Sequence, residues 1–510
     1  MIQDTVNELI LYAKFHLKMQ EADTLYFKNI LLGELGLSSP SFSPVDKERI
    51  ASYDVPDPLI DDVKKYLVNE RKFDEVEADL FTTKLMGLLS PNPSVVINDF
   101  NELEKESPRK ALDFLYDLSI KNNYIRKTDI DRNIVWDTDF SDKNLEISVN
   151  LSKPEKSNAD IAKLVAKVDS KEEKYPKCLL CLENLGFYGN KKQPARENIR
   201  IIPVRLGGED WFLQYSPYGY YHMHCICFSK EHYNMVIDYN TFIRLIKFVD
   251  RFPCFFIGSN ADLPIVGGSI LNHEHFQGGE HLLPVMKAKI EKEYKINKYV
   301  NTRLYKLDWY NTTLMIEGKD RGEVANLATD ILEKWRTYKD PVNEVYGVDF
   351  EGKHNTITPS IRKVNDTYYL YLILRNNKCT PQYPDGIFHA HKQYHMIKKE
   401  GIGIIEAMGL FILPGRLVRQ SSEIKEVLER KLNDAEIIKT YPDLEDFIQM
   451  IHDLSHKYDK DNINRDIRNY INDVCRNILI NTAVFKDTIV GKLGLDNFIR
   501  SVNLWLVKTI

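Results

Sequence analysis

Long apolar runs, signal sequences and a disulfide framework are all missing from this 510-residue sequence. No stretch of about 18 apolar residues occurs, so no membrane-spanning helix is predicted. The N-terminal sequence MIQDTVNELILYAKFHLKM spaces Asp4, Glu8 and Lys14 as in a helix, without the basic start and apolar core of a signal peptide. Seven cysteines are a sparse, odd number. We therefore expect a cytoplasmic protein whose closely spaced cysteines are metal ligands or catalytic thiols.

Strong charge of one sign is also missing. The net charge is −5, and no basic block or arginine-rich face is present, so nucleic acid is not an expected partner. The apolar content of 43% and the charged content of 28% are those of an ordinary globular protein, long enough to bury a large core.

The periodicity of apolar residues predicts an α+β protein with an antiparallel or mixed sheet and helical ends. Residues 1–140 are mainly helical, as in LIDDVKKYLVNERKF, and residues 416–510 are helical again. Strand patterns fill 141–300 and 301–415, including NLEISVNL, CFFIGSN and a hairpin around Gly207 and Gly208. We expect a short helix at NADIAKLVAKV and direct pairing of the strands in HMHCICFS and CFFIGSN.

The motif CLLC places Cys178 and Cys181 at the spacing that holds one tetrahedral metal ion. A thioredoxin-like redox pair is one alternative, although Pro176 and a Gly-rich loop flank the motif where a helix start would be needed. Two plain buried cysteines are the other. The remaining ligands would come from the histidines, of which the candidates are His222, His224, His232 and His273.

Three of the 13 histidines lie in SILNHEHFQGGEHLLP. A strand period through His273, His275 and Gln277 would put all three on one face. The preceding glycines and serine allow backbone N–H groups to approach an anion. A neutral imidazole is an adequate nucleophile toward phosphorus. The pattern predicts a phosphate site, formed by Gly267, Gly268 and Ser269, beside a nucleophile.

Five segments together resemble the galactose-1-phosphate uridylyltransferases, and more narrowly the second type, found mainly in Gram-positive bacteria. They are CLLCLEN, ARENIRIIP, QYSPYGYYHMHCICFSKEH, PIVGGSILNHEHFQGG and IKKEGIGIIEAMGLFILPGRL. The resemblance covers nearly the whole chain. It implies a histidine-triad-like sheet core, a homodimer, and exchange of UMP between UDP-glucose and galactose 1-phosphate through a uridylyl-histidine. Residues 141–300 would bind the nucleotide, and residues 301–415 would lie on the sugar-phosphate side.

The family's first type has the motif His-Pro-His-x-Gln, whose second histidine takes the uridylyl group. By this resemblance His275 is the nucleophile and Gln277 bonds the phosphate. The first histidine binds structural zinc, which gives the ligand set Cys178, Cys181, His232 and His273, with His224 in reserve. Asn272 and Glu274 stand where the first type has prolines.

Other substrate contacts follow in part from the resemblance. Asn260 matches an asparagine that contacts the nucleotide phosphates, and Glu406 matches a glutamate that reads sugar hydroxyls. Arg196, Arg200 and Lys399 are possible phosphate clamps from their charge alone, and each could equally be an ordinary surface residue.

Two other functions remain open at this point. A nucleotide hydrolase or phosphorylase of the histidine-triad group would usually carry a third histidine where Gln277 stands. A zinc-stabilised nucleotide-sugar sensor would have no need of His275 free of metal. No redox cofactor is expected.

Overall fold

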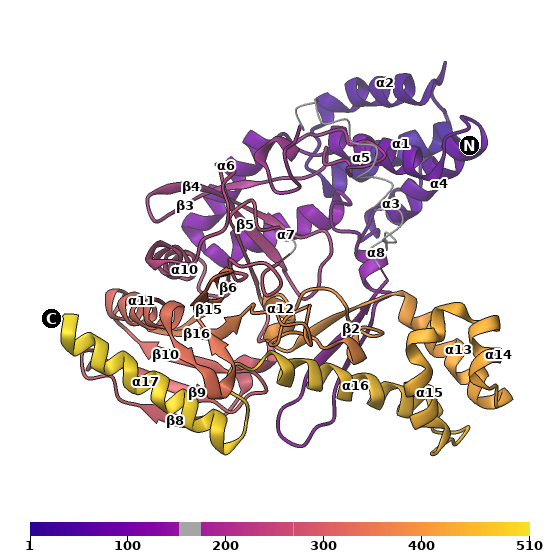
Figure 1. Cartoon of the computed structure of the whole chain (residues 1–510). Coiled ribbons are helices and arrows are strands. Elements are labelled where there is room, and N and C mark those ends of the chain that lie inside the picture. The colour runs from indigo at the N-terminus through magenta and orange to yellow at the C-terminus, as the bar shows by residue number, and fades with distance from the viewer. Residues whose placement is uncertain (152–174, 269, 510) are drawn as a thin grey trace. The chain divides into compact units, whose positions relative to one another are not determined.

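The computed structural model describes residues 1–151, 175–268 and 270–509. The expected helix at NADIAKLVAKV and the predicted phosphate contact Ser269 fall outside these residues. The described chain divides into two compact units (Figure 1). The first holds Met1–Arg132 and residues 175 to His232, and the second holds residues 133–151 and everything described from Tyr233 onward.

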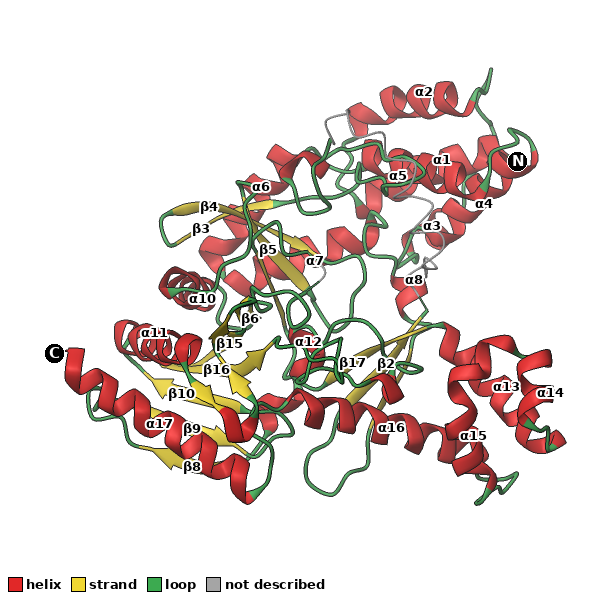
Figure 2. Ribbon diagram, viewed as in Figure 1, coloured by secondary structure: helices red, strands yellow, loops and turns green. Residues whose placement is uncertain are grey.

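Helices make up the N-terminal part of the first unit, as predicted (Figure 2). The helix α5 shows why they start where they do. The Asp74 carboxylate accepts from the N–H of Glu77, and the Glu77 carboxylate accepts from the N–H of Asp74. The helices are α1 (Ile2–His16), α2 (Thr24–Leu35), α3 (Lys47–Ala51), α4 (Asp57–Asn69), α5 (Glu75–Leu89), α6 (Pro93–Glu106), α7 (Pro108–Lys121) and α8 (Lys127–Ile130).

Three antiparallel strands complete the first unit: β3 (Ile202–Leu206), β4 (Glu209–Tyr215) and β5 (Cys225–Ser229). The predicted hairpin is confirmed. Gly207 and Gly208 have φ of 59° and 89° between β3 and β4, a left-handed pair that suits a two-residue hairpin turn. The central strand buries Trp211 and Leu213 in its core-facing pattern.

Seven antiparallel strands form the core of the second unit, in the order β7–β6–β15–β16–β10–β9–β8. The fold is therefore α+β with an antiparallel sheet, as predicted. These strands are β6 (Phe256–Gly258), β7 (His275–Gly279), β8 (Ile290–Tyr294), β9 (Thr302–Leu307), β10 (Thr313–Gly318), β15 (Asn355–Val364) and β16 (Thr367–Asn376).

The pairing of β6 corrects one prediction. This strand bonds to β7 along one edge and to β15 along the other, so neither edge is left for β5. The expected pairing of HMHCICFS with CFFIGSN is wrong. The segment that takes its place is the one that carries His275, so β6 supports the histidine strand directly.

Helices of the second unit cover the sheet and form the C-terminal region, as predicted (Figure 2). The helix α11 packs on β10, β15 and β16, with α10 and α17 beside it. The helices are α10 (Tyr239–Arg251), α11 (Arg321–Thr337), α12 (Ile404–Ala407), α13 (Arg416–Arg430), α14 (Asp434–Thr440), α15 (Ile448–Ser455), α16 (Ile463–Thr482) and α17 (Ile489–Thr509).

A smaller mixed sheet also belongs to the second unit. It pairs β1 (Ile134–Asp137) with β2 (Glu146–Asn150) in the antiparallel sense, and β2 with β17 (Leu410–Pro414) in the parallel sense. The strand predicted at NLEISVNL is β2. Across the residues that the structure describes, no helix is both long and apolar enough to cross a bilayer.

Candidate functional site

The histidine segment is only partly a strand. β7 begins at His275, while residues 272 and 273 form a bend before it. His275 and Gln277 therefore share a face, as predicted, but His273 is not held on that face by the strand. It is placed by backbone bonds instead: the N–H of Glu274 donates to the carbonyl of Tyr233 at 2.9 Å, and that of Met235 donates to Leu271 at 2.8 Å.

These backbone bonds explain how two predicted ligands meet. Tyr233 follows His232 and Glu274 follows His273, so the Glu274–Tyr233 bond brings the two histidines alongside each other. The Cys178–Cys181 turn is fixed separately. The Asn184 carboxamide donates to the carbonyls of Cys178 and Cys181, both at 2.8 Å.

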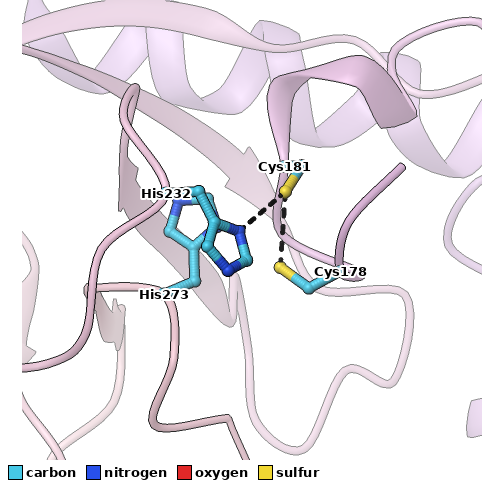
Figure 3. A group of neighbouring side chains, drawn as sticks. All are labelled: Cys178, Cys181, His232 and His273. Carbon is cyan, nitrogen blue, oxygen red and sulfur yellow. Dashed lines mark hydrogen bonds between the residues drawn. The ribbon is translucent and has the colours of Figure 1, made fainter. Parts of the chain in front are cut away.

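The four predicted ligands form one group, drawn in Figure 3. One ligand atom from each of Cys178, Cys181, His232 and His273 lies within 4.8 Å of all the others. The two sulfurs are 3.6 Å apart, and Cys181 Sγ is 3.1 Å from His232 Nδ1. His273 is fully buried. This group could bind a metal ion.

The spacing of the group can be compared with that of a real site. Two sulfurs each about 2.3 Å from a tetrahedral zinc ion lie about 3.8 Å apart. The observed 3.6 Å is close to that value. Two thiols and two imidazoles are also a common zinc set. The reserve ligand His224 lies outside the group and stacks on Tyr220 with ring centroids 5.2 Å apart.

The ring of His275 is buried and has a defined orientation. Its Nδ1 lies 2.8 Å from the carbonyl oxygen of His273. A carbonyl can only accept, so Nδ1 carries the hydrogen and the other ring nitrogen, Nε2, keeps its lone pair. Burial lowers the pKa of His275 to about 4.

A buried ion pair lies between the two histidines. Glu274 and Arg244 are both buried, and Arg244 Nη1 donates to Glu274 Oε1 at 3.0 Å. Arg244 comes from α10, whose capped start at Asp238 fixes the helix beside β6 and β15. The carboxylate at a position where the first family type has proline is thus part of the support of this segment.

The Gly-rich loop is closely packed around Asn260. A Cβ on Gly268 would lie 2.5 Å from Asn260 Nδ2, and one on Gly267 would lie 2.6 Å from the carbonyl oxygen of Ala261. A side chain at Gly267 would therefore clash with the backbone, and one at Gly268 would displace the Asn260 carboxamide. Ile265 in the same loop has φ of 73°, which is strained for a β-branched residue. Such strain is often stored at binding loops.

Glu406 belongs to the same neighbourhood through Asn260. The N–H of Ile404, at the start of α12, donates to Asn260 Oδ1 at 2.9 Å. Lys398 Nζ donates to Glu406 Oε1 at 3.0 Å and is buried. Burial alone would lower the pKa of Lys398, but Glu406 outweighs it and the pKa is raised. The predicted Lys399 is exposed, so the neighbouring lysine is the one beside Glu406.

The two predicted arginines of the first unit differ. Arg200 is buried, and its donors bond to main-chain carbonyls, chiefly Pro91 at 2.6 Å and Ile199 at 2.7 Å. It therefore ties the segment before β3 to the end of α5 and the residues that follow it, and has no donor to spare for a phosphate. Arg196 is half-buried, lies over the Tyr124 ring and donates to the carbonyl of Ala195.

Two buried residues of the second unit did not emerge from the sequence. Arg375 is fully buried on β16; its Nη2 donates to the carbonyl of Ile402 at 2.8 Å, while its Nε is without a partner. His389 is buried with both ring nitrogens unpartnered, and burial with the charge of Arg375 lowers its pKa to about 4. The histidine-rich sequence FHAHKQYH was the available signal for His389.

Comparison with known families gives two adjoining matches. Residues 45–234 match the N-terminal domain of galactose-1-phosphate uridyl transferase, and residues 248–459 match its C-terminal domain. All of the predicted ligands and the histidine strand fall inside these two ranges.

Individual relatives match over nearly the full chain. The galactose-1-phosphate uridylyltransferase of Clostridium acetobutylicum is 42% identical over 98% of this chain and 100% of its own. That of Caldanaerobacter subterraneus is 40% identical, covering 96% of both. The solved yeast Ap4A phosphorylase Apa2 is 9% identical with a TM-score of 0.30, over 57% of this chain and 83% of its own, which is too distant to assign the fold.

Proposed function

Because the chain belongs to the galactose-1-phosphate uridylyltransferase family, it is a UDP-glucose–hexose-1-phosphate uridylyltransferase of galactose metabolism, and we propose that His275 carries the uridylyl group. The substrates that the family implies are UDP-glucose and galactose 1-phosphate. The homodimer stays a prediction from the resemblance.

The orientation of the His275 ring is the observation that carries this assignment. With Nδ1–H donated to the His273 carbonyl, the Nε2 lone pair is available to attack the α-phosphorus of UDP-glucose. A P–N bond forms as the bond from that phosphorus to the oxygen of glucose 1-phosphate breaks. In the second half-reaction a phosphate oxygen of galactose 1-phosphate attacks, the P–N bond breaks, and UDP-galactose forms.

This chemistry needs positioned donors more than acids. Each leaving group is a phosphate that departs as an anion, so no proton has to be supplied to it. Gln277 on the same strand face would donate its carboxamide N–H to the transferring phosphate. A third histidine in its place would favour hydrolysis, which is the reason for preferring transfer over the hydrolase or phosphorylase alternative.

Substrate contacts follow from what lies in the second unit near β7. We assign the phosphates to Asn260, Gly267, Gly268 and the neighbouring Ser269, and the sugar hydroxyls to Glu406. Lys398 joins this set as the lysine that holds Glu406. Arg196 and Lys399 stay in the proposal as phosphate contacts, and Arg200 is left out because its donors are already used.

The metal ion is best assigned as structural zinc. Cys178, Cys181, His232 and His273 would fill all four tetrahedral positions, which leaves none for substrate. Bound zinc would contribute to stability by linking segments that are distant in sequence. It would also fix His273, whose carbonyl orients the nucleophile.

Isotope exchange and an alkaline quench, under which the P–N bond of a uridylyl-histidine survives, test the proposal. Labelled glucose 1-phosphate should enter UDP-glucose without a second substrate, and enzyme quenched after mixing with labelled UDP-glucose should yield a uridylylated peptide containing His275. A hydrolase would consume UDP-glucose, and a sensor would do neither. Label on another residue, or exchange without a covalent intermediate, would refute the assignment.

A further inference from the structure

A cavity of about 280 Å³ lies within the helical part of the first unit. One wall is a single face of α4, where residues 57, 60, 61 and 64 recur at helical spacing. The other wall is the segment from residue 123 to residue 132, which runs from the end of α7 through α8. At this volume the cavity is slightly smaller than the usual small-molecule site and suits a small ligand.

The basic side chains that line the cavity are already occupied by carboxylates. Lys64 Nζ and Arg126 Nη2 both bond to Asp79, at 2.9 and 2.6 Å. Arg132 is paired with Asp129. Lys64 and Arg126 share one carboxylate, so these pairs alone leave one positive charge, but Asp57 and Asp61 also line the cavity. With Asp79, four carboxylates face three cations, a balance that favours a cation over an anion.

Two hydrogen-bond acceptors that line the cavity, in contrast, have no partner. Asp57 Oδ2 and Asn123 Oδ1 are buried atoms without a hydrogen-bond partner, although the Thr128 hydroxyl bonds to the Asp57 carboxylate. Burial raises the pKa of Asp57, and the charges of Asp129 and Asp61 add to the shift. An unpaired buried acceptor destabilises the folded protein, and a donor that enters the cavity would recover this cost.

We propose that this cavity binds a small organic ammonium ion, whose N–H groups donate to Asp57 and Asn123. An ammonium has three donors and no acceptor, which matches a wall whose unmet groups are all acceptors. A divalent metal ion fits less well, since among the described residues these carboxylates do not come close enough together to form a ligand group. The site is independent of the uridylyl transfer, and its test does not rest on that function.

Calorimetric titration of the full-length protein with 1,4-diaminobutane tests this site. The matched neutral probe is 1,4-butanediol, and potassium chloride at equal ionic strength controls for charge screening. We expect saturable binding of the diamine at one site per chain, with no saturable binding of the diol. Equal binding of the diol, displacement by potassium at equal ionic strength, or absence of diamine binding would each overturn the proposal.

Two variants locate the binding. Asn123 has φ of 58°, so Asn123→Gly removes the acceptor and keeps a backbone that glycine readily adopts. We expect the affinity to fall roughly ten- to hundredfold. Its control is Asn365→Gly, the same substitution at an exposed position with φ of 52°. Unchanged affinity in Asn123→Gly would overturn the site.

The second variant is Asp57→Asn, which removes the charge and keeps the shape. We expect a similar loss of affinity, because an ammonium bonds more strongly to a carboxylate than to a carboxamide. The control is Asp62→Asn, on the exposed side of the same helix and outside the cavity. Wild-type rates of label exchange in Asn123→Gly would separate the cavity from the catalytic chemistry. A loss of diamine binding in Asp62→Asn equal to that in Asp57→Asn would contradict the proposal.

Discussion

Arg200 of the first unit and Arg244 of the second are both buried arginines, but only Arg244 has a carboxylate partner. Arg244 bonds to Glu274, whereas Arg200 bonds to carbonyls and its neighbour Glu197 keeps a buried Oε2 without a partner. The paired charges lie beside the proposed nucleophile, and the unpaired ones lie under the N-terminal helices. The difference teaches that an ion pair fixes the histidine segment, whereas Arg200 is held by main-chain carbonyls and Glu197 is buried with no partner for its Oε2.

The largest effect is expected at the proposed nucleophile, beside which the paired charges lie. His275→Ala should lower label exchange roughly 10⁴-fold or more, because no other group is placed to carry the uridylyl unit. Fold and bound metal should be unchanged by circular dichroism and metal analysis. His275→Gly should regain transfer when uridylyl-imidazole is supplied, since the small molecule replaces the missing ring.

The neighbouring histidine sharpens this test. His273→Ala should lose metal and stability and keep more activity per folded molecule than His275→Ala. If His273→Ala proved the more damaging to exchange in folded protein, the two roles would have to be reversed.

Removal of a sulfur ligand should have the next largest effect. Cys181→Ser should lower the bound metal well below one ion per chain and cost about 4 kcal/mol or more of stability, the range of a lost metal site. Expressed as free energies, the loss of turnover per folded molecule should be smaller than the loss of the free energy of unfolding. Elemental analysis measures the bound metal, and thermal unfolding measures the stability. The matched control is Cys254→Ser, which lies outside the four-residue group. Normal metal content in Cys181→Ser would remove it from the ligand set.

Local patterns in the sequence predicted much of this site, because they depend only on short spacings. The CLLC spacing, the two-residue period of His275 and Gln277, and the hairpin at Gly207–Gly208 all concern neighbours within a few residues. The sequence could not show that the strand begins only at His275, because His273 is placed by a backbone bond to a distant segment.

Long-range partners could not be predicted in the same way. Arg244 and Glu274 are thirty residues apart and meet because α10 packs beside β6. The choice between Lys398 and Lys399 depends on which side of the chain faces Glu406. The wrong pairing of β5 with β6 has a similar cause, since consecutive strands often pair and here β7 occupies that edge.

Breaking the buried pair tests the comparison directly. Glu274→Gln should cost about 3 kcal/mol of stability, because the buried Arg244 loses the carboxylate to which its Nη1 donates at 3.0 Å. Exchange should also fall, since the segment between the two histidines loses its anchor. The double variant Arg244→Met with Glu274→Gln should recover part of the stability in urea unfolding. Additive losses in the double variant would mean that the two side chains do not stabilise each other.

A smaller effect is expected from the phosphate donor on the same strand. Gln277→Ala should lower the rate of exchange by about one to three decades through loss of one transition-state donor. Stability should change little because the side chain is half-buried at the strand face. Gln277→Glu, which replaces the N–H donor by an acceptor with the same negative charge as the phosphate, should be at least as slow. A rate equal to wild type in Gln277→Ala would show that the phosphate is bound elsewhere.

The smallest effect belongs to the unpaired acid of the first unit. Burial raises the pKa of Glu197 to about 7, so the folded protein binds a proton there that the unfolded chain releases near pH 4.5. Stability from this group is therefore lost as the pH rises from about 4.5 to 7. Because the side chain is only half-buried, the loss is about 1–2 kcal/mol and not the full shift. In urea unfolding, Glu197→Gln should be as stable as wild type at pH 4.5 and more stable than wild type at pH 8. Glu70→Gln, at an exposed position, should show no such change with pH. A stability difference that does not change between these pH values would mean that Glu197 is ionised in the folded protein, and that the two units do not differ in how they hold buried charge.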